Sequence, residues 1–119
     1  TFDVVFMACV MHHIIPEERQ RTLKECRRVL KDDGRLILFE HNPNNPVTMK
    51  LVNTCPFDED AVLLHMSETK KLLKAAGFTC ITGRYTMFLP RKGFFNKITG
   101  IERALTWLPL GGQYYVTAR

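Results

Sequence analysis

The sequence predicts an α/β fold, a mixed sheet of about four strands with helices packed on it. Three observations lead to this prediction. Residues 2–9 form a short, uniformly apolar segment, a helical pattern follows from Pro16, and a second apolar segment covers residues 35–40. A strand, a helix and a second strand in this order form a parallel pair with a right-handed crossover. Strands of such sheets are covered on both faces, which explains their continuous apolar character.

The first helix is predicted to begin at Pro16, since proline suits the first helical position and Glu17 and Glu18 favour the positive end of the helix dipole. Its apolar side repeats at helical spacing, while the basic side chains of the same segment are expected to face water. The apolar positions are Leu23, Cys26 and Leu30, and the basic ones are Arg19, Lys24, Arg27 and Arg28. We expect residues 32–34 to end the helix, with the glycine in a left-handed conformation.

The middle of the chain contains two capping signals. Residues 41–46 favour a turn, in which Asn45 could cap a short helix that has Pro46 at its first position. Ser67 is predicted to cap a further helix, which Gly77 ends. Between them the pattern is ambiguous, because residues 58–61 could begin a helical piece and residues 62–64 could equally be extended. The two aspartates of this region, Asp58 and Asp60, are interpreted as caps.

The last third of the chain is expected to hold strands over residues 78–88 and 113–118. Between them, apolar residues are spaced as on one face of a helix. They are Phe94, Ile98, Ile101, Leu105 and Leu108. This stripe packs on the core in our preferred interpretation, and peripheral membrane binding is the alternative, because basic residues flank it.

Composition limits the function classes. At 119 residues with 45% hydrophobic content, the chain suits one globular domain. The net charge of +5 comes from scattered basic residues, so we expect no nucleic-acid partner. The four cysteines show no paired spacing and are expected to be reduced. No apolar run approaches the ~20 residues of a membrane span and no leader precedes Thr1, so we expect a cytoplasmic protein.

Three short motifs occur in order along the chain. Residues 2–6 lead through an apolar stretch into the pair His12-His13, and residues 28–36 read Arg-Val-Leu-Lys-Asp-Asp-Gly-Arg-Leu. Residues 72–78 read Leu-Leu-Lys-Ala-Ala-Gly-Phe. The three resemble the fourth strand, the helix-to-fifth-strand junction and the junction before the sixth strand of class I S-adenosylmethionine-dependent methyltransferases. The second motif departs from the family pattern, which has Pro-Gly in place of Asp32-Asp33.

This resemblance implies a Rossmann-like sheet with the strand order 3-2-1-4-5-7-6 and an antiparallel seventh strand. Residues 1–119 would be a single partial domain that carries strands four to seven. The family's glycine-rich loop after strand one and the acidic residue that ends strand two have no counterpart in the sequence. We therefore expect S-adenosylmethionine as the cofactor of the intact protein, with weak or no binding to this chain alone.

The resemblance also assigns candidate site residues at the carboxyl ends of the first two strands, where ligands of open α/β sheets bind. Ala8, Cys9, Met11 and His13 would meet the cofactor. His12, Glu40 and His41 would face the methyl acceptor, with His41 as the preferred base. His13 could instead satisfy a buried backbone carbonyl.

A metal site is not expected. Its only candidate ligands near these strands are His12, His13, His41 and Cys9, and their spacing is irregular. We also expect the adjacent histidines to point in different directions.

These observations predict that the intact protein transfers a methyl group to a small-molecule or sugar-like acceptor. This chain would supply the acceptor-side rim and would be inactive by itself. A second interpretation is a non-catalytic interaction module, which forms a homodimer through the exposed edge of residues 2–9. Peripheral membrane binding is the third.

Overall fold

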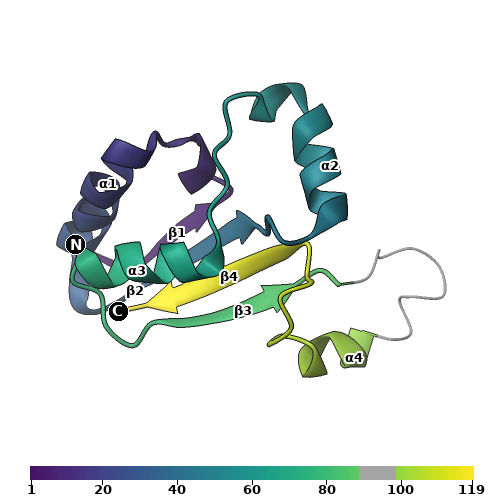
Figure 1. The fold of residues 1–119 in the computed structure, drawn as a ribbon. Coiled ribbons are helices and arrows are strands. Elements are labelled where there is room, and N and C mark those ends of the chain that lie inside the picture. The colour runs from purple at the N-terminus through teal and green to yellow at the C-terminus, as the bar shows by residue number, and fades with distance from the viewer. Residues whose placement is uncertain (89–98) are drawn as a thin grey trace.

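The computed structural model describes residues 1–88 and 99–119 (Figure 1). The helices and strands alternate along most of the chain, as expected for an α/β fold. In order they are β1 (Phe2–Ala8), the 3₁₀ turn η1 (Met11–His13), α1 (Pro16–Val29), β2 (Leu30–His41), α2 (Pro46–Thr54), the 3₁₀ turn η2 (Pro56–Asp58), α3 (Met66–Ala75), β3 (Thr82–Thr86), α4 (Thr99–Ala104) and β4 (Gln113–Ala118).

The strands form one mixed sheet in the order β1-β2-β4-β3. β1 runs parallel to β2, with Phe6 opposite Ile37. β4 is antiparallel to both of its neighbours, and Phe39 of β2 lies opposite Tyr115. The predicted mixed four-stranded sheet is therefore confirmed. Its order corresponds to the expected sequence of family strands 4-5-7-6.

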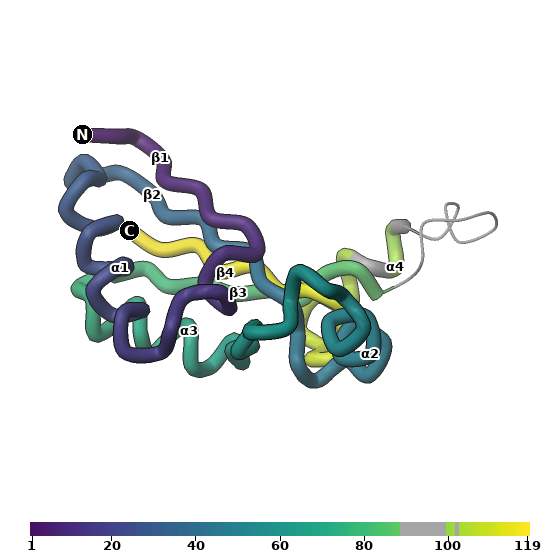
Figure 2. Tube along the Cα trace, turned by 90° about the horizontal axis from the view of Figure 1, so that it is seen from above, coloured from purple at the N-terminus to yellow at the C-terminus, as the bar shows by residue number. Residues whose placement is uncertain are grey.

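The two faces of the sheet differ. Helices α1 and α3 lie together on one face (Figure 2), where Leu36, Leu38, Tyr114 and Val116 are completely buried. Side chains on the opposite face of β1 remain open, and Phe6 is 60% exposed. The described part of the chain thus builds a core on one side of the sheet only.

The junction between α1 and β2 differs from the prediction. The helix ends at Val29 and β2 begins directly at Leu30, so Gly34 lies inside the strand. Among the described glycines only Gly77 has a positive φ, and the expected left-handed turn at Gly34 is wrong. A Cβ atom at this position would be crowded, because it would lie 3.0 Å from the carbonyl oxygen of Phe2.

The two capping predictions had different outcomes. Asn45 caps α2 as expected, since its side-chain oxygen accepts a hydrogen bond from Thr48 N at 2.9 Å. The predicted cap of α3 at Ser67 is wrong, because this helix already begins at Met66 after His65. The Glu68 side chain accepts a hydrogen bond from His65 N at 2.8 Å and thereby caps the start of the helix. Gly77 ends the helical segment with φ 91°, as predicted.

The third strand is shorter than the predicted 78–88 segment. It spans Thr82–Thr86, because Cys80 (φ 48°) and Met87 (φ 60°) adopt the left-handed conformation on either side of it. The final strand at residues 113–118 is confirmed. The described part of the predicted helix over 94–108 is shorter than expected, because α4 ends at Ala104, before Leu105 and Leu108. Ile101 is 49% exposed, so the expectation that it packs on the core is wrong. Phe94 and Ile98 lie outside the described residues.

The cysteines are all free thiols, as expected. Within the described ranges, no helix has the length and apolar character needed to cross a membrane.

Candidate functional site

Glu40, near the end of β2, organises the turn that follows β1. Its side chain is 1% exposed. One carboxylate oxygen accepts hydrogen bonds from Val10 N at 3.2 Å and Met11 N at 2.7 Å. The other lies 2.5 Å from His12 Nδ1. Because hydrogen bonds to a charged acceptor are stronger than neutral ones, this buried carboxylate fixes both the backbone of the turn and the ring of His12.

The residues predicted to meet the cofactor lie at the end of β1 and in the turn that follows, and they differ in exposure. Cys9 has φ 55°, which lets the chain leave the strand sharply, and its N–H still donates to Phe39 O at 2.9 Å. Ala8 is exposed and Cys9 is half-buried. Met11 is completely buried in the core, whereas the His13 side chain is 43% exposed. Ala8, Cys9 and His13 are thus accessible at this end of the sheet, and the Met11 side chain is not.

Arg19 connects α1 to this turn and to a distant part of the chain. The side chain is 6% exposed, so the expectation that it faces water is wrong. Its Nε donates to Met11 O and Ile14 O, and an Nη atom donates to Val62 O at 2.6 Å. A backbone hydrogen bond of 2.8 Å from Val62 N to His12 O reinforces this connection. The segment that contains Asp58 is therefore held against η1.

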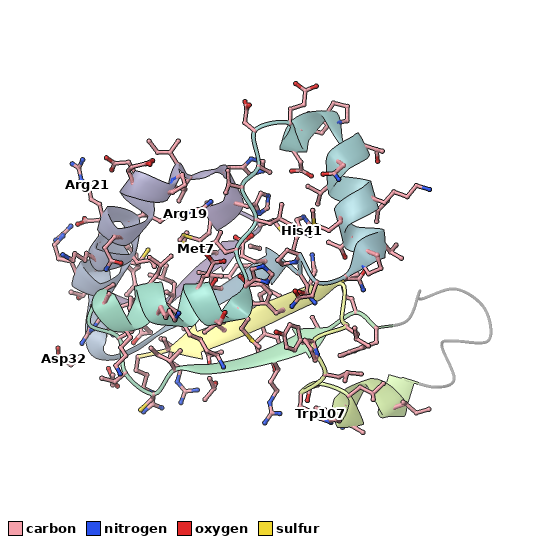
Figure 3. All side chains as sticks on the ribbon, viewed as in Figure 1. Met7, Arg19, Arg21, Asp32, His41 and Trp107 are labelled. Atoms are coloured by element: carbon pink, nitrogen blue, oxygen red, sulfur yellow. The ribbon has the colours of Figure 1, made fainter. Side chains whose placement is uncertain are left out.

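The two adjacent histidines converge on Asp58. His12 Nε2 lies 3.6 Å and His13 Nε2 lies 3.4 Å from the same carboxylate oxygen, and the two ring centres are 4.2 Å apart. The prediction that these rings point in different directions is wrong, because the 3₁₀ turn brings them side by side. His41, where β2 leads to α2 (Figure 3), has its ring centre 5.2 Å from that of His12.

Burial and neighbouring charges shift the pKa values of three groups in this region. Burial by itself would lower the pKa of His12, but the hydrogen bond to Glu40 and the negative charges of Glu40 and Asp58 outweigh it and raise that pKa. Burial lowers the pKa of His41, and the nearby His12 adds to the effect. Burial, together with Glu40 and Asp58, raises the pKa of the Cys9 thiol. The environment thus favours a neutral His41 and a neutral Cys9.

Asn42, which follows β2, has a structural role. It is 1% exposed, and its amide nitrogen donates to Gly111 O at 2.7 Å and to Pro109 O at 3.1 Å. Its amide oxygen accepts from Asn44 N. The side chain therefore joins the end of β2 to the segment that leads into β4.

A cavity of about 670 Å³ lies next to this cluster. Polar and apolar side chains both contribute to its lining, among them Asn53, Asp58 and Glu59 on the polar side and Met49, Val52 and Val62 on the apolar side. Asp58 belongs to both the cavity wall and the histidine cluster. A cavity of this size with a mixed lining is suited to a small molecule.

All the predicted site residues come from the carboxyl ends of β1 and β2, in or directly after these strands. Of these residues, the structure brings His12, His13, Glu40 and His41 into one cluster. Asp58 was missed as a site residue, because its sequence context resembles an ordinary cap. The only signal in the sequence was an acidic residue in a segment of ambiguous secondary structure.

Comparisons with known proteins give matches to methyltransferases. The family model described as "Methyltransferase domain" matches residues 1–38. A curated protein of Encephalitozoon cuniculi, named "Putative methyltransferase", is 45% identical over 40 residues, which are 33% of this chain and 19% of that protein.

Solved structures match over nearly the whole chain. A SAM-dependent methyltransferase from Archaeoglobus fulgidus aligns over 98% of this chain with a TM-score of 0.72 and 18% identity. A Thermotoga maritima structure, described as a SAM-dependent methyltransferase and possible histamine N-methyltransferase, aligns over 99% with a TM-score of 0.72 and 19% identity. The chain has the class I S-adenosylmethionine-dependent methyltransferase fold. The resemblance seen in the three sequence motifs is thereby confirmed.

The chain is shorter than these methyltransferases. It spans 58% of the Archaeoglobus fulgidus chain and 55% of the Thermotoga maritima chain. Phosphoethanolamine N-methyltransferase 2 of Haemonchus contortus, solved in complex with S-adenosyl-L-methionine, aligns over 98% of this chain and 33% of its own length, with a TM-score of 0.57 and 14% identity. The sheet described above thus corresponds to a portion of each methyltransferase structure.

Proposed function

We propose that this chain is the acceptor-side portion of an S-adenosylmethionine-dependent methyltransferase that acts on a small-molecule or sugar-like acceptor. The observation that carries the proposal is the cavity beside the histidine cluster, which is lined by residues of α2, of η2 and of the segment after η2. The histidine cluster itself lies at the carboxyl ends of β1 and β2, where ligands of open α/β sheets bind. Asn53, Asp58 and Glu59 offer hydrogen-bonding groups of the kind that hydroxylated molecules need.

The described residues fit one side of the cofactor. Ala8 is small and exposed, and the left-handed conformation of Cys9 opens the backbone at the end of β1. These two residues and His13 would form a wall beside the methionine end of S-adenosylmethionine. When bound, the cofactor supplies an electrophilic methyl group. Within residues 1–88 and 99–119, no strand pairs with the outer edge of β1, so these residues offer no second wall.

Methyl transfer requires alignment of the acceptor with the sulfonium methyl, and in some cases a base. His41 is the proposed base, because it lies at the carboxyl end of β2 in the environment that favours its neutral form. The geometry of His12 and Glu40 fits positioning residues better than groups that touch the acceptor. Both are buried, and Glu40 accepts three hydrogen bonds from the turn.

Calorimetry tests the proposal that this chain alone binds the cofactor weakly. The 119-residue chain should bind S-adenosylmethionine no more tightly than about 100 μM, since much of the binding free energy would come from outside it. A longer protein that contains this chain should bind at micromolar concentration. Micromolar binding to the 119-residue chain alone would contradict the proposal. In the longer protein, His41→Gln should lower methyl transfer about 100-fold while cofactor affinity stays unchanged.

The free edge of β1 supports a second candidate, a homodimer formed by strand pairing. β1 is the edge strand of the sheet, and Phe2, Val4 and Phe6 are 59%, 52% and 60% exposed. An exposed, apolar edge strand is a template for pairing with another chain. Light scattering of the 119-residue chain should give the mass of a dimer at high concentration. A monomer at all concentrations would remove this candidate.

A further inference from the structure

The cluster of His12, His13 and Asp58 has the composition of a metal site. The three side chains offer two imidazole nitrogens and a carboxylate oxygen, all within 4.8 Å of one another. They come from two segments, the turn after β1 and the end of η2. Arg19 and the hydrogen bond from Val62 N to His12 O hold these segments together. The packing between these two segments therefore supports the convergence of the three side chains.

His12 is prepared to act as a ligand. Its ring is 1% exposed, and Nδ1 lies 2.5 Å from the Glu40 carboxylate. A proton on Nδ1 leaves the lone pair on Nε2, which is the arrangement found in carboxylate–histidine–metal triads. Nε2 is buried and has no hydrogen-bond partner among the residues that the structure describes. Since buried polar atoms are nearly always bonded, this nitrogen requires an additional partner.

The distances fit a shared ion better than direct hydrogen bonds. A charge-assisted hydrogen bond between nitrogen and a carboxylate is about 2.7–2.9 Å long. The two Nε2 atoms lie 3.6 and 3.4 Å from the Asp58 oxygen, so a gap separates these groups. A tetrahedral zinc ion holds such ligands at about 2.0–2.2 Å, which places neighbouring ligand atoms about 3.3–3.6 Å apart.

We propose that His12 Nε2, His13 Nε2 and the Asp58 carboxylate bind a divalent transition-metal ion of the zinc class, with Glu40 orienting His12. Two imidazoles and one carboxylate suit Zn²⁺ better than Mg²⁺ or Ca²⁺, which prefer ligand sets made of oxygen. The site can be reached from solvent, because the side chains of His13 and Asp58 are 43% and 13% exposed.

Titration of the metal-free 119-residue chain with Co²⁺ and Zn²⁺ tests this site directly. Co²⁺ should give the visible absorption of a four-coordinate complex with one ion per chain, and Zn²⁺ should displace it. Asp58→Asn and His13→Gln should each weaken Zn²⁺ binding at least about 100-fold, because each removes one of three ligands. Glu40→Gln should weaken it about 10- to 100-fold, as observed when the partner of a metal-bound histidine is replaced.

Two matched variants serve as controls. Asp60→Asn removes an exposed carboxylate two residues from Asp58, and His65→Gln removes an exposed imidazole outside the cluster. Both should bind Zn²⁺ like the original chain, and circular dichroism of every variant without metal should report an unchanged fold. Equal affinities for the cluster variants and the controls, or no binding below about millimolar Zn²⁺, would overturn the proposal. The assay contains no methyl donor, so its outcome is independent of the proposed methyl transfer.

Discussion

The two faces of the sheet contain similar apolar side chains but have different environments. On the face that α1 and α3 cover, Leu36, Leu38 and Val116 are completely buried. On the opposite face, Phe39 stacks against Tyr115 with ring centres 5.3 Å apart and contacts Phe6 at 5.8 Å, yet Phe6 remains 60% exposed. Alternation along β2 therefore separates a helix-covered core from an aromatic surface that no described helix covers.

This difference indicates that the covered face stabilises the chain and the open face is available for contacts. Burial of apolar surface contributes roughly 25 cal/mol per Å², so residues removed from water dominate the stability. An apolar face left in contact with water contributes little. Substitutions in neighbouring residues of one strand can separate the two roles.

The largest effect is expected for Leu38→Ala. This side chain is completely buried under the helices, and its truncation should lower the free energy of unfolding by about 2–5 kcal/mol. Ile37→Ala is the matched control on the opposite face, where the half-buried side chain should contribute only about 1 kcal/mol. Urea denaturation of both variants measures the difference. Equal losses would show that the open face is covered in solution.

An intermediate effect is expected for Tyr114→Phe. The buried hydroxyl of Tyr114 shares a 2.7 Å hydrogen bond with Thr69 and donates to Leu64 O at 3.0 Å. Its loss leaves the Leu64 carbonyl oxygen and the Thr69 hydroxyl without this partner and should lower the free energy of unfolding by about 1–2 kcal/mol. Tyr115→Phe, on the other face, should leave stability nearly unchanged. If thermal melting shows the same loss for both variants, the assigned difference between the faces is wrong.

The buried phenol of Tyr114 should also make the stability of the fold depend on pH in the alkaline range. Burial raises the pKa of Tyr114 well above its usual range, so the folded chain keeps this phenol neutral where the unfolded chain ionises it. The associated stability is complete below about pH 10 and is lost as the pH rises further. Unfolding measured from pH 8 to 11 should show this decrease, and Tyr114→Phe should reduce its slope. Part of the slope should persist, because burial also raises the pKa of Tyr85.

The smallest effect on stability is expected for Phe6→Ser. The exposed ring contributes little to the core, so the free energy of unfolding should change by less than about 1 kcal/mol. Self-association should decrease, because the substitution removes apolar surface next to the free edge of β1. Sedimentation velocity at several concentrations compares this variant with the original chain. Unchanged self-association would show that the contact between chains does not involve this part of the sheet.

The sequence by itself determined the elements that depend on local chemistry. Continuous apolar segments predicted β1 and β2, Pro16 and Asn45 marked two helix starts, and Gly77 marked a helix end. The three motifs predicted the fold class and the end of the sheet where the site residues meet. The elements follow from propensities and spacing, which act over a few residues, whereas the site residues followed from the resemblance to the methyltransferase family.

Only the tertiary structure decided which polar residues act together. Arg19 belongs to a polar helical face in the sequence, but its guanidinium is buried because the carbonyl groups of η1 and Val62 provide acceptors for it. Asp58 resembles a cap, yet it faces two histidines that lie more than forty positions earlier in the chain. Gly34 leaves little room for a side chain, because the carbonyl oxygen of Phe2 approaches it. Contacts of this kind arise from packing between distant segments, and no local sequence pattern encodes them.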